Sequence, residues 1–115
     1  NARAPRLNLA RGNVSSLAGA GQEANTLQVA TRQRSGNGGG PLIDGWGNVI
    51  GVMMSRLKTP DRGRRVDLAL KGAIAKRFLD RHGVKYLTAS AREKIDVAEI
   101  AARARKSTLL LECWQ

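Results

Sequence analysis

The stretch S-G-N-G-G-G-P-L-I-D, residues 35–44, decides how this chain is interpreted. Four of the five residues in 36–40 are glycine, and a proline and an apolar segment follow them. A run of this kind holds backbone shapes that residues with a Cβ atom adopt only at a cost. We therefore expect a tight loop here, and the segments on either side of it indicate the rest of the fold.

Short strands are predicted on both sides of the loop. Behind it, residues 41–44 form a strand, Gly45 and Gly47 supply positive φ angles in a turn, and the long apolar run after that turn is the expected central strand. Six predicted strands cover residues 7–10, 13–17, 26–30, 41–44, 49–57 and 66–70. This spacing predicts a mainly β fold, as a small antiparallel barrel or sandwich.

The pattern changes after residue 71. Residues 72–82 have apolar side chains at helical spacing and end before Gly83, and residues 96–106 form a second short helix with one apolar face. Residues 108–114, T-L-L-L-E-C-W, are a predicted terminal strand that should pair with this sheet or with a partner's. We expect a barrel over residues 1–71 and a helical tail ending in this strand over residues 72–115.

Composition limits the chemistry and the partners. With 20 Lys and Arg against 9 Asp and Glu, the net charge is +11, which attracts nucleic acid. The densest basic cluster, residues 58–65, has no aromatic residues for base stacking, which favours a solvated surface over a nucleic-acid site. Cys113 is the single cysteine, so no internal disulfide and no cysteine-based zinc site are expected. No other metal and no cofactor are expected either. No apolar run reaches the ~18 residues of a membrane span.

The glycine loop and the hairpin behind it resemble the nucleophile loop of chymotrypsin-fold serine peptidases, the trypsin-like family. That family has G-[DN]-S-G-G-P-L, a turn, and a strand such as V-x-G-V, and its HtrA-like bacterial members have asparagine in second place. The matching residues here are Gly36, Asn37, Gly39, Gly40, Pro41 and Leu42, followed by residues 47–52. The resemblance implies a six-stranded antiparallel barrel of the trypsin-like type, one of the family's usual two, followed by two short helices and a terminal strand.

The resemblance also implies a site built largely from backbone groups. The N–H groups of Gly36 and Gly38 correspond to the oxyanion hole, which stabilises the tetrahedral intermediate of acyl transfer. The strand that pairs with an extended peptide substrate, and the entrance to the specificity pocket, correspond to Met53, Met54, Ser55, Thr31 and Arg32. An arginine that faces this pocket would disfavour basic substrate side chains.

The family's nucleophilic serine falls on Gly38, which has no side chain. No acyl-enzyme can form without a hydroxyl group, and the family's His and Asp belong to a first barrel with no counterpart in these residues. His82 comes after the loop and is expected at a helix end, and Cys113 is expected in the core. We predict the C-terminal half of a trypsin-like serine endopeptidase that does not hydrolyse peptides. Natural and engineered loss of the serine both fit the sequence.

Other interpretations stay open from the residues alone. The glycine loop could be structural and without peptidase ancestry, or the chain could be a basic module that binds peptide or nucleic acid. Half of a two-barrel protein exposes an apolar face, which suits the missing first barrel or a second copy in a homodimer. The family's members work in the periplasm or outside the cell, which is the expectation that the resemblance brings for location.

Overall fold

The computed structural model of the chain describes residues 9–19, 23–31, 38–54, 67–89 and 93–109. Its elements, in chain order, are β1 (Gly12–Ser16), β2 (Thr26–Thr31), β3 (Pro41–Ile43), β4 (Val49–Met53), β5 (Asp67–Lys71), α1 (Gly72–Arg81) and α2 (Val97–Ser107). The predicted mainly β character and both predicted helices are confirmed. None of the described helices is long and apolar enough to cross a membrane.

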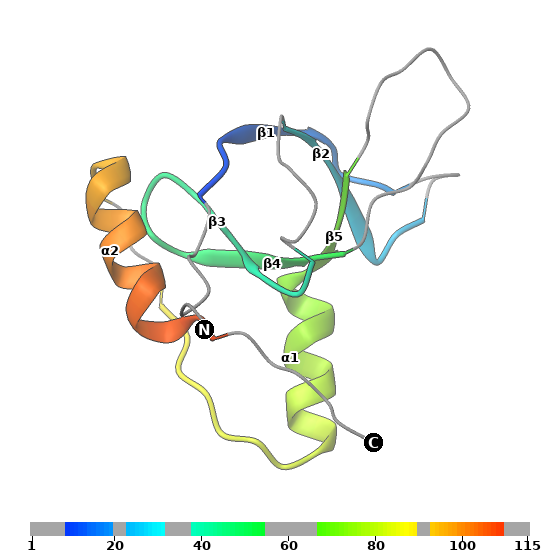
Figure 1. Cartoon of the computed structure of the whole chain (residues 1–115). Helices are drawn as coiled ribbons and strands as arrows, with labels where there is room; N and C mark the ends of the chain where they lie inside the picture. The colour runs from blue at the N-terminus through cyan, green and yellow to red at the C-terminus, as the bar shows by residue number, and fades with distance from the viewer. Residues whose placement is uncertain (1–8, 20–22, 32–37, 55–66, 90–92, 110–115) are drawn as a thin grey trace, which may run out of the picture.

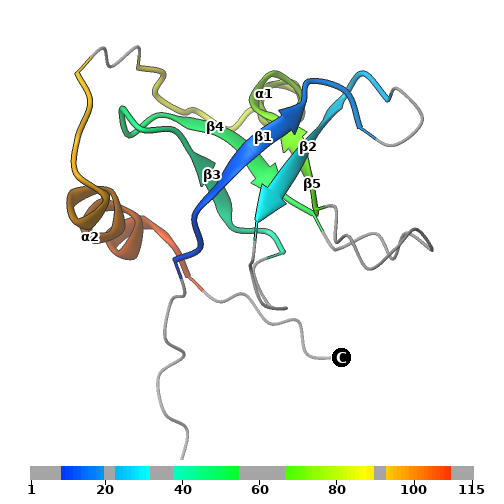
Figure 2. The ribbon, with the colours of Figure 1, turned by 90° about the horizontal axis from the view of Figure 1, so that it is seen from above.

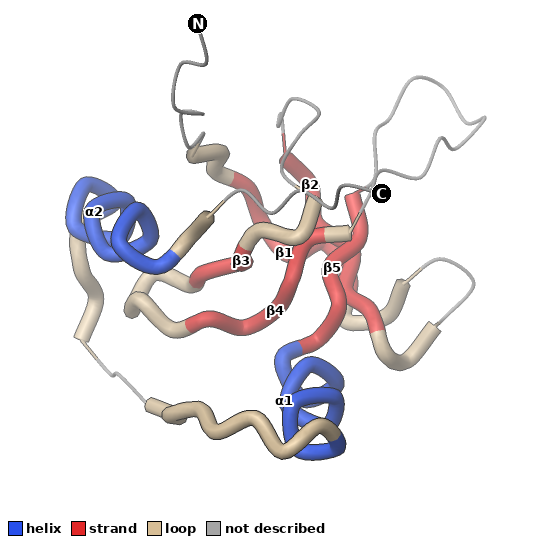
Figure 3. The backbone as a smooth tube through the Cα atoms, turned by 60° about the horizontal axis from the view of Figure 1, so that its bottom comes forward, coloured by secondary structure: helices blue, strands red, loops and turns tan. Residues whose placement is uncertain are grey.

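The five strands form one antiparallel sheet in the order β1-β2-β5-β4-β3. The sheet curls like an open barrel, so its edge strands β1 and β3 approach each other across the open side (Figure 1). The same arrangement is visible from above and from below (Figures 2 and 3). Shifts of register in the two hairpins, between Val14 and Ser16 and between Leu42 and Ile43, are irregularities of the kind that bend and twist a sheet.

Two expectations about the strands need correction. The strand at residues 49–57 is not the central one, because β5 pairs with both β2 and β4 and so occupies the middle of the sheet. The predicted strand at residues 7–10 is not seen at Leu9 and Ala10, and its first two residues lie outside the described part of the chain. Likewise, Thr108 and Leu109 are not in a strand, and the remainder of the predicted terminal strand lies outside the described residues.

The core lies on one face of the middle strands. Leu27 and Val29 are alternate residues of β2, so their side chains share that face, where Met53 of β4 and Ala69 of β5 join them. Ala69 pairs with Leu27 on one side and with Met53 on the other, and it is fully buried. Its small side chain lets the larger neighbours approach each other from both sides. Leu42 of β3 is half-buried against this cluster.

Helix α1 continues from β5 without a loop and ends as the sequence predicts. Gly83 has φ +67°, and its N–H donates to the Asp80 carbonyl, while the Val84 N–H donates to the Leu79 carbonyl at 2.9 Å. These bonds form the usual glycine-terminated helix end. Beyond it, the Tyr86 hydroxyl donates to an Asp80 carboxylate oxygen at 2.9 Å, and this hydrogen bond is the main reason that the pKa of Tyr86 is raised.

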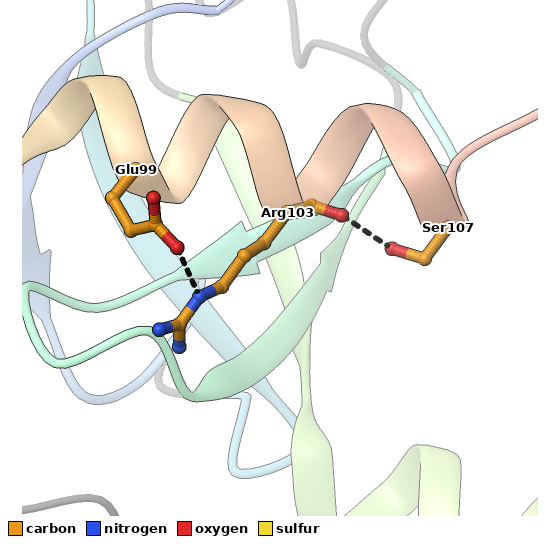
Figure 4. A network of polar contacts seen from close by, with 3 residues as sticks. All are labelled: Glu99, Arg103 and Ser107. Carbon is orange, nitrogen blue, oxygen red and sulfur yellow. Dashed lines mark hydrogen bonds and ion pairs between the residues drawn. The ribbon is translucent and has the colours of Figure 1, made fainter.

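Helix α2 lies beside the β3–β4 hairpin (Figures 1 and 2). Ile100 and Ala101 are its buried residues. Along the helix, Arg103 Nε donates to Glu99 Oε1 at 2.9 Å, and the Ser107 hydroxyl donates to the Arg103 carbonyl at 3.4 Å (Figure 4). Both side chains of the ion pair are more than half exposed, so burial, rather than the ion pair, holds this helix in place.

Gly51 tests how closely β4 and β5 pack. A Cβ atom at this position would lie 2.7 Å from the Leu70 carbonyl oxygen, which is backbone and cannot move aside. Gly51→Ala should therefore lower the free energy of unfolding by about 1–3 kcal/mol, measured by urea denaturation. Gly45→Ala is the matched control, because its nearest neighbour would be the Lys94 side chain at 3.6 Å. Equal losses in the two variants would contradict this packing.

Candidate functional site

The described part of the candidate site is the glycine loop and the strand end beside it. Gly38 is exposed in a turn that leads into β3, Met53 is the last residue of β4, and Met54 follows it. Met53 is buried and Met54 is 40% exposed. Thr31 is the last residue of β2. The other predicted site residues, Gly36, Arg32 and Ser55, lie outside the described residues.

Two hydrogen bonds join the loop to the end of β4. The Gly39 N–H donates to the Met53 carbonyl at 2.6 Å, and the Met53 N–H donates to the Gly40 carbonyl at 2.8 Å. Both loop residues thus face one residue of β4. Gly39 has φ +85°, and a Cβ atom there would meet nothing within 4 Å. Glycine is therefore required at this position by backbone conformation and not by lack of space.

Beyond Met53, the chain stays paired with β5. The Met54 N–H donates to the Leu68 carbonyl at 2.8 Å, which continues the pairing of β4 with β5. Both backbone polar groups of Met53 and the N–H of Met54 therefore have partners within the chain. The backbone of Met53 thus faces the glycine loop, while the N–H of Met54 faces β5.

The turn between β3 and β4 is held by the Asp44 carboxylate. Asp44 Oδ1 accepts from the Trp46 N–H at 3.0 Å and from the Asn48 N–H at 2.9 Å. Gly47 has φ +86°, as the sequence predicts. The positive φ predicted for Gly45 is wrong, because the Asp44 side chain caps this part of the turn and a single left-handed glycine closes it.

The hairpin turn also anchors the segment before α2. The Ile95 N–H donates to the Gly45 carbonyl at 3.0 Å. The Ile95 side chain covers Gly47 closely, since a Cβ atom on that glycine would lie 2.9 Å from Ile95 Cδ1. The tail that follows α1 is thereby fixed to the same hairpin that carries the glycine loop.

The sequence pattern gave no sign of a buried carboxylate near this strand end. Asp67, the first residue of β5, is fully buried, lies opposite Val29 of β2, and interacts with another group of the chain. It immediately precedes Leu68, the residue that accepts the hydrogen bond from Met54. An acidic residue within an alternating segment is expected on the solvent side, so only the observed strand order reveals this burial.

The remaining candidate residues do not join the site. His82 lies at the C-terminal end of α1, where its ring packs on Phe78 with centroids 4.5 Å apart. Cys113 lies outside the described residues. Within the described ranges, no three His, Cys, Asp or Glu side chains come together as a group that could hold a metal ion.

Comparison with known proteins adds one relative. No family model and no solved structure matches this chain. The chain is similar to a protein of Sinorhizobium fredii (strain NBRC 101917 / NGR234) called "Uncharacterized protein y4bJ", with 38% identity over 113 residues. The match covers 92% of this chain but 18% of the length of y4bJ, so the chain spans less than a fifth of that relative.

Asp44 offers a test of how firmly the hairpin is held. Asp44→Ala removes the acceptor of two backbone N–H groups and should lower the free energy of unfolding by about 1–2 kcal/mol in urea denaturation. Asp44→Asn keeps a side-chain oxygen that can accept in the same place and should lose less than half as much. If the two variants are equally destabilised, the carboxylate charge and not the accepted hydrogen bonds holds the turn.

Proposed function

We propose that the chain is the second barrel and C-terminal tail of a trypsin-like serine peptidase fold whose nucleophile has been lost. The observation that carries the proposal is the pairing of Gly39 and Gly40 with Met53. It brings together the two segments that the family's mechanism needs side by side, the loop that binds the reacting carbonyl and the strand that holds the peptide.

The resemblance suggests an extended peptide as the ligand. By the family's pattern, a peptide substrate pairs through its main chain with the segment around Met53 and Met54. The Gly38 N–H belongs to the exposed loop beside that strand. Backbone N–H groups in such loops bind carbonyl and carboxylate oxygens, so the proposed ligand is a peptide with its carbonyl at the loop.

We propose that the site binds a peptide but does not cleave it. Peptide hydrolysis in this family begins when a hydroxyl attacks the carbonyl, and Gly38 supplies no hydroxyl. The loop can still polarise a bound carbonyl, but no covalent intermediate follows. We thus propose an inactive relative of serine endopeptidases that retains peptide binding.

The same proposal extends to the fold. A six-stranded trypsin-like barrel would need one more strand between β1 and β3, the two edges of the curled sheet. These edges already face each other across the open side (Figure 1). The curl is therefore compatible with closure by a single additional strand.

Restoring the hydroxyl tests the proposal. In the complete natural protein, Gly38→Ser should give covalent labelling by a fluorophosphonate, which reacts with activated serines, and hydrolysis of casein. The unchanged protein and Gly38→Ala should give neither, because both lack the nucleophile. Absence of labelling in a folded Gly38→Ser protein would overturn the peptidase ancestry.

A basic binding module is the second candidate, and two observations favour it. The chain carries a net charge of +11, and large apolar side chains are exposed on several elements. If nucleic acid is the ligand, affinity for a fluorescent oligonucleotide should fall steeply between low and moderate salt, because phosphate contacts release counterions. Affinity for an extended peptide should change little over that range, since it depends on main-chain pairing. Fluorescence anisotropy at two salt concentrations distinguishes the two candidates.

A further inference from the structure

Helix α1 and the segment that follows it carry large apolar side chains that no described residue covers. None of the residues of α1 is buried, and Phe78 is 60% exposed. Residues 82–89 are all exposed, among them Val84, Tyr86 and Leu87, and the Leu87 side chain is 100% exposed. Apolar side chains that gather on a surface in this way indicate contact with another apolar surface.

Hydrogen bonds fix the backbone that carries these side chains. The Val84 N–H donates to the Leu79 carbonyl at 2.9 Å, and the Tyr86 hydroxyl donates to an Asp80 carboxylate oxygen at 2.9 Å. The segment after α1 is thus tied back to the helix on both sides of Lys85. Because this segment is already ordered, less conformational entropy is lost when a ligand covers it.

The same surface is strongly basic. Residues 71–89 contain five cationic side chains and one carboxylate, Asp80, which already accepts the hydrogen bond from Tyr86. In β4 and β5, the strands that α1 contacts, Asp67 is the one acidic residue, and it is fully buried. A ligand that complements this surface must therefore combine negative charge with apolar groups. The five cationic residues are Lys71, Lys76, Arg77, Arg81 and Lys85.

An anionic lipid bilayer meets both requirements. Its headgroups attract lysine and arginine, and its acyl chains accept exposed aromatic and aliphatic side chains. Arg81 follows Phe78 by three residues on α1, so a cation and an apolar side chain are neighbours on the helix surface. The long stems of such basic residues lie along apolar surface while their charges stay at the headgroups. Nucleic acid would also attract the cations, but its phosphates offer no apolar region for Val84 and Leu87.

The position of this surface in the fold suits contact with a bilayer. Helix α1 and the segment after it extend away from the sheet (Figures 1 and 3). Helix α1 begins near the start of β4, because a Cβ atom on Gly72 would lie 3.1 Å from the Ile50 carbonyl oxygen. The glycine loop instead pairs with Met53, the last residue of β4. We propose that α1 and residues 82–89 bind peripherally to an anionic bilayer surface, independently of the peptide site proposed above.

Sedimentation with lipid vesicles tests this proposal in the complete natural protein. The protein should bind vesicles made of equal parts phosphatidylcholine and phosphatidylglycerol, and it should bind vesicles of phosphatidylcholine alone at least about tenfold more weakly. Lys76→Ala with Arg77→Ala should weaken binding to the anionic vesicles by about tenfold or more, because two cations at the surface are lost. Arg105→Ala with Lys106→Ala is the matched control, since it removes the same charge from the exposed end of α2.

A second pair of variants tests the apolar contact separately from the charge. Leu87→Asp should weaken binding to the anionic vesicles by about tenfold or more, because an inserted side chain is replaced by one that the acyl chains exclude. Leu109→Asp changes the net charge equally at a position that is 88% exposed beside α2, and it should have a much smaller effect. Both leucines are exposed, so neither variant should disturb folding.

Four outcomes would overturn the proposal. The first is failure of the unchanged protein to bind the anionic vesicles, and the second is equal binding to both kinds of vesicle. The third is equal weakening by the α1 variants and their α2 controls, which would mean that only the net charge matters. The fourth is binding of a single-stranded oligonucleotide but not of anionic vesicles, which would assign the cations of α1 to nucleic acid.

Discussion

The pairing of β4 with a neighbour on each side at Met53 is the constraint on which the rest of the structure depends. The backbone of this residue holds Gly39 and Gly40, and its side chain packs on Ala69 in the core. A shift of β4 by one residue would turn that side chain out of the core and release the loop at the same time. The position of the glycine loop is thus set by the hydrophobic core, although Gly38, Gly39 and Gly40 have no side chains that could pack there.

Features that depend on neighbours in sequence could be predicted. Gly47 and Gly83 adopt the left-handed conformations expected of a turn and of a helix end, and β2, β3 and β4 start within a residue of the expected positions. Alternation and helical spacing are local signals, and so is the glycine pattern that led to the candidate loop. In the described residues, the part of the site that is observed is the hydrogen bonding of this loop to Met53 at the end of β4.

Features that depend on strand order could not be predicted. The length of the apolar run at residues 49–57 indicates burial but does not show which strands lie beside it, so β5 was overlooked as the central strand. Alternation in residues 66–70 points to Leu68, which is buried, but it does not reveal that Ala69 and Asp67 on the other face of β5 are buried as well. A central strand is covered on both faces, and the small size of Ala69 is an advantage that no hydrophobicity pattern reveals.

The strand order has a consequence for how the chain folds as it is synthesised. The β1–β2 and β3–β4 hairpins form from neighbouring segments, but neither pairs with the other, because β5 lies between them. Until the ribosome has released Ala69, Leu27 and Met53 have no common neighbour and the core cannot assemble. Both hairpins must wait, each with one strand edge unpaired, and a chain in that state is open to association with other chains. When β5 pairs with β2 and β4, it joins the two hairpins into one sheet.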